Sequence, residues 1–367
     1  MARWPNDRRR VAAGPPVSLP VQLPVEPMLA RTAASIPAGL WYEPKWDGFR
    51  CLVFRDNDDV QLISRNGRDL SAYFPEVVAA VLENLPPRCV LDGELIVING
   101  SRLDFGKLSE RIHPAASRVR MLAATWPASF VAWDLLALDD TALLSTPFNQ
   151  RRAALERALA HSDAPIFLTP ITTDLDVARE WFDAFEGAGL DGVVAKAPDG
   201  EYLPGQRAMI KIKHKREADV VVGGYRLHKN STAERPLLGS LQLGLFGDGV
   251  LHFVGVSAAF PDATRASLAD MLGQLTLSPA AAHPWSAVEV AGRRPGAISR
   301  WSTELRETQL IDPLLVCSVG YEHMEGTRFR HTTRFLRWRP DRQPESCTFD
   351  QLDEVVSFDL DVILGRS

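Results

Sequence analysis

The sequence has few cysteines and no long apolar run. Its 367 residues include four cysteines, Cys51, Cys89, Cys317 and Cys347, and no two of them form a C-x-x-C pair. This pattern excludes a cysteine zinc knuckle and a disulfide framework, and it predicts a protein of the reducing cytoplasm. No apolar run reaches the ~20 residues of a membrane span, and residues 1–20 contain no apolar signal core. We therefore expect no membrane association.

An excess of positive charge is also missing. Lysine and arginine number 41 against 46 aspartates and glutamates, which leaves a net charge of −5. With 46% hydrophobic and 24% charged residues, the chain has the composition of a soluble globular protein with room for two domains. An acidic protein that binds nucleic acid must concentrate its positive charge locally. Residues 326–342 do so, because they hold six arginines against one acid.

A charged cluster interrupts an apolar region early in the chain. Residues 43–50 read Glu-Pro-Lys-Trp-Asp-Gly-Phe-Arg, and residues rich in large apolar side chains precede and follow them. Such flanks are typical of strands. Burial and neighbouring cations favour the neutral amine of a lysine held between strands, so Lys45 is a candidate nucleophile. Taken alone, the octapeptide is also compatible with a polar strand turn that has Asp-Gly at its tip.

The remaining pattern predicts two domains that differ in their secondary structure. Apolar spacing predicts helices at residues 75–85, 149–161, 174–187 and 262–275. Apolar runs predict strands at residues 60–63, 90–97, 130–136, 210–213, 220–224, 241–246 and 250–256. Beyond about residue 215, short strands with glycine turns and one helix are typical of a small barrel of the OB type.

These observations set the expected boundaries. Residues 1–27, with Arg8, Arg9 and Arg10 and several prolines, are expected to form a flexible arm. Residues 28–215 are expected to form the first domain. Residues 216–367 are expected to form the barrel domain, which includes an acidic C-terminal tail. In that tail, Val355, Val356 and Phe358 are expected to pack on the barrel.

Two pairs of charged residues lie on predicted strands. Lys211 and Lys213 are two apart, so their side chains point to the same face, where they would favour a neutral Lys45 and bind a phosphate. On their own they are more typical of the exposed edge of an amphipathic strand, and the Asp-Gly-Val-Val-Ala-Lys run before them favours the functional interpretation. Glu94 and Asp191 each lie among apolar strand residues, where a carboxylate is costly unless it is paired or bound to a cation. Both are candidate Mg²⁺ ligands.

The order of these motifs resembles that of the covalent nucleotidyltransferases, which include ATP-dependent DNA ligases, RNA ligases and mRNA capping enzymes. The resemblance covers residues 27–342 and is strongest to the small bacterial stand-alone ligases of the ligase C type. It rests on K-x-D-G-x-R at 45–50, Asp-Gly-Glu at 92–94, Asp-Gly-Val-Val-Ala-Lys at 191–196, Lys-x-Lys at 211–213 and Arg-Trp-Arg-Pro-Asp-Arg at 337–342. The implied fold class is α+β, with an adenylation domain of mixed antiparallel sheets and helices followed by an OB-fold β-barrel.

The resemblance also implies a role for each candidate residue. Lys45 would carry AMP, with Asp47, Lys211 and Lys213 as further catalytic residues. Glu94 and Asp191 would bind the metal; Asp191 stands where the family usually has glutamate. Contacts to the nucleotide would come from Glu43, Arg50, Arg65, Glu94, Trp133, Arg207, Arg339, Asp341 and Arg342, where Trp133 replaces the usual Phe or Tyr and Arg342 replaces the usual lysine.

The implied function is ATP-dependent sealing of nicked double-stranded DNA in repair, with ATP and Mg²⁺ (or Mn²⁺) as cofactors. The expected protein is a monomer of the bacterial cytosol and nucleoid, working with a separately encoded repair polymerase. Two alternatives remain open from the residues. One is an RNA ligase or a capping-type nucleotidyltransferase. The other is a non-catalytic nucleic-acid-binding module, which intact Lys45, Asp47 and Glu94 argue against.

Overall fold

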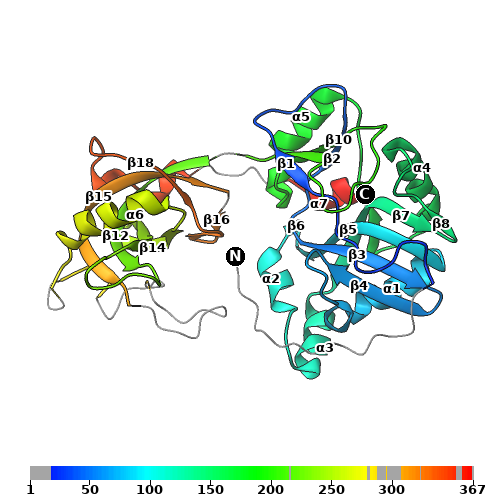
Figure 1. Cartoon of the computed structure of the whole chain (residues 1–367), viewed down its shortest axis with the longest axis horizontal. Coiled ribbons are helices and arrows are strands. Elements are labelled where there is room, and N and C mark those ends of the chain that lie inside the picture. Colours follow the sequence, from blue (N-terminus) through cyan, green and yellow to red (C-terminus); the bar gives the residue numbers. More distant parts are fainter. Residues whose placement is uncertain are drawn as a thin grey trace. The chain divides into compact units, whose positions relative to one another are not determined.

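The computed structural model describes residues 18–214, 216–278, 282–286, 295, 307–322, 324–352 and 358–365. These residues form two compact units (Figure 1). The first unit holds described residues 18–213 and 358–365, and the second holds those from 214 to 352. The division after Lys213 lies two residues from the boundary that the sequence pattern suggests.

Two sheets build the first unit. One has the strand order β1 (Ala30–Thr32), β11 (Met209–Ile212), β10 (Val193–Lys196) and β2 (Trp41–Pro44). The other has the order β4 (Asp59–Ser64), β3 (Phe49–Asp56), β5 (Arg88–Asn99), β7 (Ala128–Leu138) and β8 (Thr141–Ala142), with β6 (Arg102–Leu103) beside β5 and β9 (Ile166–Leu168) beside β7. All pairs are antiparallel except β1 with β11 and β7 with β9. The predicted α+β class is confirmed.

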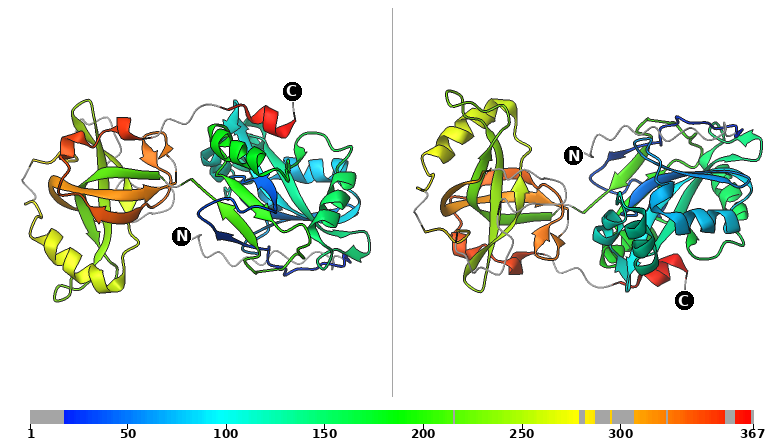
Figure 2. Two further views of the ribbon diagram at one scale, coloured as in Figure 1. Left: turned by 90° about the horizontal axis from the view of Figure 1, so that it is seen from above. Right: turned by 90° about the horizontal axis from the view of Figure 1, so that it is seen from below.

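Helices cover these sheets (Figures 1 and 2). They are α1 (Pro75–Asn84), α2 (Phe105–Glu110), α3 (Ala116–Thr125), α4 (Phe148–Ala158), α5 (Leu175–Ala184) and α7 (Leu360–Leu364), with short 3₁₀ turns η1 (Ser71–Tyr73) and η2 (Phe185–Ala188). Helix α1 begins with Pro75, whose missing N–H is not needed in a first turn. The carboxylate of Asp174 caps α5 by accepting hydrogen bonds from the N–H groups of Asp176 and Val177.

The second unit is a five-stranded sheet of the order β14 (Val250–Ser257), β13 (Leu238–Gly247), β12 (Arg216–Leu227), β15 (Gln309–Tyr321) and β18 (Arg334–Trp338). Its two edge strands are joined where Thr333 N donates to Val256 O at 2.9 Å, which closes an OB-type barrel. Asp248 and Gly249 both have positive φ in the β13–β14 hairpin, as a tight two-residue turn requires. Around the barrel lie α6 (Asp262–Gly273), β16 (Met324–Glu325), β17 (Arg328–Phe329), η3 (Pro344–Ser346) and η4 (Phe349–Gln351).

Two expectations about the chain ends are wrong. Residues 18–27 do not belong to a flexible arm, because Leu19 and Val21 are buried in the core of the first unit and Ser18 N donates to Asp56 Oδ2 at 2.9 Å. Residues 1–17 lie outside the described residues. Phe358 packs on the first unit and not on the barrel, since its ring lies 5.1 Å from that of Phe185. Val355 and Val356 also lie outside the described residues.

A buried ion pair holds α4 against the second sheet. Arg151 and Asp134 are almost fully buried, and Arg151 Nε lies 2.7 Å from Asp134 Oδ1. Arg151 Nη1 also donates to Gly200 O at 3.0 Å. The guanidinium therefore ties helix α4, strand β7 and the segment after β10 together.

We predict that Arg151→Met lowers the free energy of unfolding of the first unit by about 3–5 kcal/mol, because the Asp134 carboxylate would stay buried without its partner. Urea denaturation followed by tryptophan fluorescence measures the loss. Arg157→Met is the matched control, since Arg157 is exposed on the same helix. Equal unfolding midpoints for the two variants would contradict the prediction.

Candidate active site

Lys45 is held by the backbone of a neighbouring strand. It follows β2, and its N–H donates to Gly192 O at 2.8 Å while its carbonyl accepts from Asp191 N at 2.9 Å. Gly192 has φ of +127°, and a Cβ there would stand 2.1 Å from Ile212 O. Only glycine fits this approach. The Asp-Gly pair at 191–192 thus fixes the position of the Lys45 backbone.

One carboxylate joins two of the predicted lysines. Asp191 Oδ2 lies 2.8 Å from Lys45 Nζ and 3.0 Å from Lys213 Nζ. Burial raises the pKa of the Asp191 carboxyl, but the two ammonium groups outweigh burial and hold that pKa well below its usual range. The structure thus brings Lys45, Asp191 and Lys213 together, as the motifs suggest. Lys211 lies on β11, which pairs with β10, and it is in register with Val194 of that strand.

Glu94 lies on β5 in register with Arg50 on β3. Its Oε1 accepts a hydrogen bond from Gly48 N at 3.0 Å, and a Cβ on Gly48 would stand 2.1 Å from Leu95 O. Burial raises the pKa of Glu94 to about 8, although Lys45 and Arg50 lower it; Asp47 adds to the rise. The predicted residues Lys45, Asp47, Arg50 and Glu94 therefore share one electrostatic environment.

Arg50 has its own carboxylate partner. Its Nε donates to Asp92 Oδ1 at 2.9 Å, and the other oxygen of Asp92 accepts from Tyr202 Oη at 2.8 Å. The Arg50 guanidinium stacks over the Trp133 ring, 5.4 Å from its centroid. Sequence reasoning assigned Arg50 and Trp133 but gave no role to Asp92 or Tyr202. The sequence did contain a signal: Asp92 lies within an apolar strand, and a buried carboxylate there requires a cation nearby.

Glu43 is buried beside two cations that sequence reasoning missed. Its Oε2 lies 2.7 Å from Lys196 Nζ, and its Oε1 lies 3.8 Å from Arg152 Nη1. Burial raises the pKa of Glu43, and the attraction of Lys196 and Arg152 opposes this rise. Among the described residues, neither Glu43 Oε1 nor Arg152 Nη1 has a hydrogen-bond partner. A buried carboxylate on β2 requires a countercharge, which was the signal for Lys196 on the neighbouring β10.

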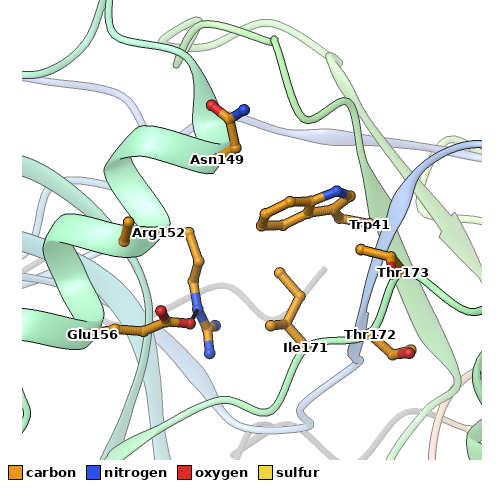
Figure 3. Close-up of a pocket in the computed structure, with 8 residues that line it drawn as sticks. Trp41, Asn149, Arg152, Glu156, Ile171, Thr172 and Thr173 are labelled. Carbon is orange, nitrogen blue, oxygen red and sulfur yellow. Dashed lines mark hydrogen bonds and ion pairs between the residues drawn. The ribbon is translucent and has the colours of Figure 1, made fainter.

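Arg152 also lines a pocket of about 360 Å³ (Figure 3). Trp41 lies on one side of it, and the Arg152 and Glu156 side chains of α4 meet on the other, with Arg152 Nε 2.7 Å from Glu156 Oε1. Arg152 Nη2 also donates to Thr169 O at 2.8 Å. Arg152 thus lines this pocket and also lies beside Glu43.

The structure does not bring every predicted residue into this cluster. Arg65 lies in the exposed turn after β4, and none of the described contacts joins it to the cluster. Arg207 is exposed and donates to Ala30 O at 3.1 Å. Both therefore lack a described contact with Lys45 or its neighbours.

The last predicted motif forms a separate cluster on the barrel. Arg339 Nη1 lies 2.7 Å from Asp219 Oδ2, and Arg339 Nη2 lies 2.8 Å from Asp341 Oδ2. Arg342 Nε lies 3.7 Å from the same Asp219 oxygen. The hydrogen bond from Arg339 is the main cause that lowers the pKa of Asp341 to about 2. Sequence reasoning missed Asp219, which orients both arginines.

Two absences hold for the described part of the chain. There, no three His, Cys, Asp or Glu side chains gather as a metal-binding group. The same residues include no helix that is long and apolar enough to cross a membrane.

Comparison with known proteins places this site in a family. Residues 27–213 match the ATP dependent DNA ligase domain, and residues 234–342 match the ATP dependent DNA ligase C terminal region. DNA ligase C2 of Mycolicibacterium smegmatis is 51% identical over 351 residues, which cover 92% of this chain and 96% of that protein. DNA ligase C of Mycobacterium tuberculosis is 50% identical over 361 residues, which cover 95% and 99%.

A solved structure of a Lig E DNA ligase shares the fold. Its TM-score is 0.54 at 16% sequence identity, and the match covers 86% of this chain and 99% of that one. The two matched ranges fall in the two units. They include the Lys45 cluster and, on the barrel, Arg339, Asp341 and Arg342, whereas Asp219 lies between the two ranges. From these matches and the geometry of the site, we conclude that this chain belongs to the ATP-dependent DNA ligases.

Proposed function

We propose that the chain seals nicks in duplex DNA through a covalent Lys45–AMP intermediate. The Lys45 amine attacks the α-phosphorus of ATP, a P–N bond forms, and pyrophosphate leaves. The AMP then passes to the 5′-phosphate of the nick and frees Lys45. Finally, the 3′-hydroxyl attacks that phosphate, the phosphodiester bond forms, and AMP leaves. The observation that carries this proposal is the Lys45–Asp191–Lys213 arrangement, in which a lysine lies between strands beside a second cation.

Each neighbour of Lys45 has a distinct part in the first step. Asp191 holds Lys45 Nζ at 2.8 Å, which fixes the direction of the amine. Lys213, with Lys211, would stabilise the negative charge that grows on the α-phosphate. Asp47 adds negative charge beside Glu94. The lysine must lose a proton before it attacks, so a neutral amine is needed in this step.

The carboxylates fit a hard divalent cation. Mg²⁺ prefers oxygen ligands, keeps several waters and needs only one or two protein carboxylates. Glu94 is a buried carboxyl with a raised pKa of about 8, the environment in which an added cation lowers the cost of ionisation. We propose that Glu94 and Asp191 hold Mg²⁺, for which Mn²⁺ can substitute. The metal would neutralise charge on the ATP phosphates.

The nucleotide base and sugar would lie along β2 and β7. Glu43 is buried two residues before Lys45, and its Oε1 has no hydrogen-bond partner, as an acceptor for the adenine amino group requires. Trp133, with Arg50 stacked on it, would pack on the adenine ring. Arg65 and Arg207 would bind phosphate from exposed positions. Arg339, Asp341 and Arg342 would act on the pyrophosphate.

The cellular setting follows from the same proposal. The substrate is nicked double-stranded DNA, and the sealing step serves DNA repair after a separately encoded polymerase has filled the gap. The protein would act as a monomer in the bacterial cytosol, at the nucleoid.

We expect Lys45→Ala to abolish covalent AMP formation and ATP-dependent sealing, because the P–N bond needs this amine. Labelled ATP followed by denaturing electrophoresis detects the adduct. Lys107→Ala is the control. Lys107 is on α2, and its Nζ packs 3.3 Å from the centroid of the Trp126 ring, so this variant should form the adduct normally. Labelled protein in the Lys45→Ala sample would refute the assignment of the nucleophile.

Metal binding should release a proton from Glu94. Its pKa is about 8, so at pH 7 most of the carboxyl groups are protonated and must ionise before they bind Mg²⁺. The apparent Mg²⁺ affinity, in the presence of a non-hydrolysable ATP analogue, should therefore rise about tenfold from pH 7 to pH 9 and level off above the pKa.

Calorimetry in two buffers of different ionisation enthalpy counts the released protons. Glu94→Gln has the same shape but no carboxyl proton to lose, so both the release and the pH dependence should shrink. An affinity that falls as the pH rises, or an equal proton release in Glu94→Gln, would contradict the metal assignment.

The barrel cluster should serve only the reaction with ATP. If Arg339, Asp341 and Arg342 act on pyrophosphate, Asp341→Ala and Arg342→Ala should reduce sealing with ATP by about 100-fold or more. A nick that already carries AMP on its 5′-phosphate skips pyrophosphate release, so its sealing should change much less.

Arg337→Ala supplies the comparison for duplex binding, because Arg337 is an exposed arginine of the same segment and reaches only Glu217, at 3.5 Å, among the described residues. It should leave AMP formation unchanged. Equal losses with ATP and with the pre-adenylated nick in Asp341→Ala and Arg342→Ala would show that these residues hold DNA instead.

A further inference from the structure

The last described segment of the chain lies against the first unit. After the barrel, residues 358–365 return to that unit as helix α7, drawn in red in Figures 1 and 2. Asp359 caps the helix by accepting from Asp361 N at 3.0 Å, and Gly365 ends it in a left-handed conformation. Leu360 N donates to Ser101 O at 3.0 Å, which attaches the start of the helix beside β6.

One face of α7 is part of a core. Leu360 has no exposed surface and Ile363 is 6% exposed, whereas Val362 between them is 63% exposed. Leu360 and Ile363 share a hydrophobic cluster with Trp46, Ile96 and Leu190. Burial of two large side chains indicates a docked helix rather than a loosely attached tail.

This core lies directly behind the reacting groups. Trp46 follows Lys45, Leu190 precedes Asp191, and Ile96 lies two residues after Glu94, so each of three site residues has a neighbour in the cluster. Trp46 is held from its other end, where Nε1 donates to Thr169 Oγ1 at 2.8 Å.

A second route joins α7 to Asp191. The Phe358 ring contacts the Phe185 ring at 5.1 Å, and Phe185 opens the turn η2 that leads through Gly189 to Leu190 and Asp191. Gly189 has φ of +87°, and a Cβ there would come within 3.1 Å of Leu103, so this approach is tight. The α7 segment thus belongs to the apolar cluster that contains Trp46 and Leu190, the chain neighbours of Lys45 and Asp191.

We propose that helix α7 is a positioning element for nucleotidyl transfer, in which Leu360 and Ile363 act through Trp46 and Leu190 to hold Lys45 against Asp191. Neither side chain touches the reacting atoms. A shift of the Lys45 amine by even about 1 Å would slow attack on the α-phosphate strongly. This inference rests on the proposed function, because it concerns the rate of the Lys45–AMP step.

The test is single-turnover AMP transfer to Lys45 at saturating ATP. The amplitude of the reaction counts correctly folded molecules, and the rate constant reports the position of the amine. Leu360→Ala and Ile363→Ala should lower the rate constant about tenfold or more while the amplitude and the apparent ATP affinity stay near those of the unchanged protein. Val362→Ala, on the exposed face of the same helix, should change none of these values. Leu360→Met, which conserves volume, should keep the rate constant near that of the unchanged protein, unlike Leu360→Ala.

Each outcome decides the proposal. A lower amplitude with an unchanged rate constant would show that α7 only stabilises the fold, and would overturn it. An unchanged rate constant in Leu360→Ala and Ile363→Ala, or an equal loss in Val362→Ala, would also overturn it. If the unchanged protein forms no AMP adduct at all, the proposed function itself fails, which is a distinct result.

Discussion

The structure depends most on one carboxylate that two lysines share. Lys45 and Lys213 each lie within 3.0 Å of the same oxygen of Asp191. Two ammonium groups at this separation repel each other, and a half-buried position strengthens the repulsion. The negative charge of Asp191 offsets this repulsion and holds the two Nζ atoms at 2.8 Å and 3.0 Å from its Oδ2. Because Asp191 also bonds to Lys45 through the backbone, the side-chain and main-chain contacts fix the same residue from two directions.

The pKa of a second carboxyl close to Lys45, that of Glu94, is shifted in the opposite direction. The pKa of Asp191 is held low by two cations, whereas burial raises that of Glu94 to about 8. Neighbouring carboxyls with pKa values driven apart can take different roles at neutral pH. We therefore propose that ionised Asp191 orients the lysines, while Glu94 exchanges its proton for the metal ion. The hydrogen bond from Gly48 N to Glu94 Oε1 opposes the effect of burial on this pKa, and a Cβ on Gly48 would stand 2.8 Å from the Glu94 side chain.

Buried ion pairs also hold the side chains of the proposed nucleotide site. Arg50 is held by Asp92, which is held in turn by Tyr202. Lys196 and Arg152 surround Glu43 from β10 and α4. These partners keep the side chains proposed to contact the nucleotide in one conformation before it binds, which lowers the ordering cost of binding. The α7 segment extends this support to the apolar layer behind Lys45.

The sequence alone determined the α+β class, the family, and the main elements. Strong apolar periodicity identified helix α1 and the buried strands β5 and β7, and glycine signals such as Asp248-Gly249 marked hairpin turns, since these depend on neighbours in the chain. Motif spacing also identified Lys45, Glu94 and Asp191. Only the tertiary structure decided which charges meet. The pairs Glu43 with Lys196 and Arg50 with Asp92 join residues of neighbouring strands, so the pairing of the strands and not spacing in the chain sets them. Arg339, just after β18, meets Asp219 of β12, which the sheet order brings near it. The same reason explains the wrong expectation for Phe358: an apolar residue in a short segment packs wherever a core is open, and that choice depends on contacts more than 150 positions away in the chain.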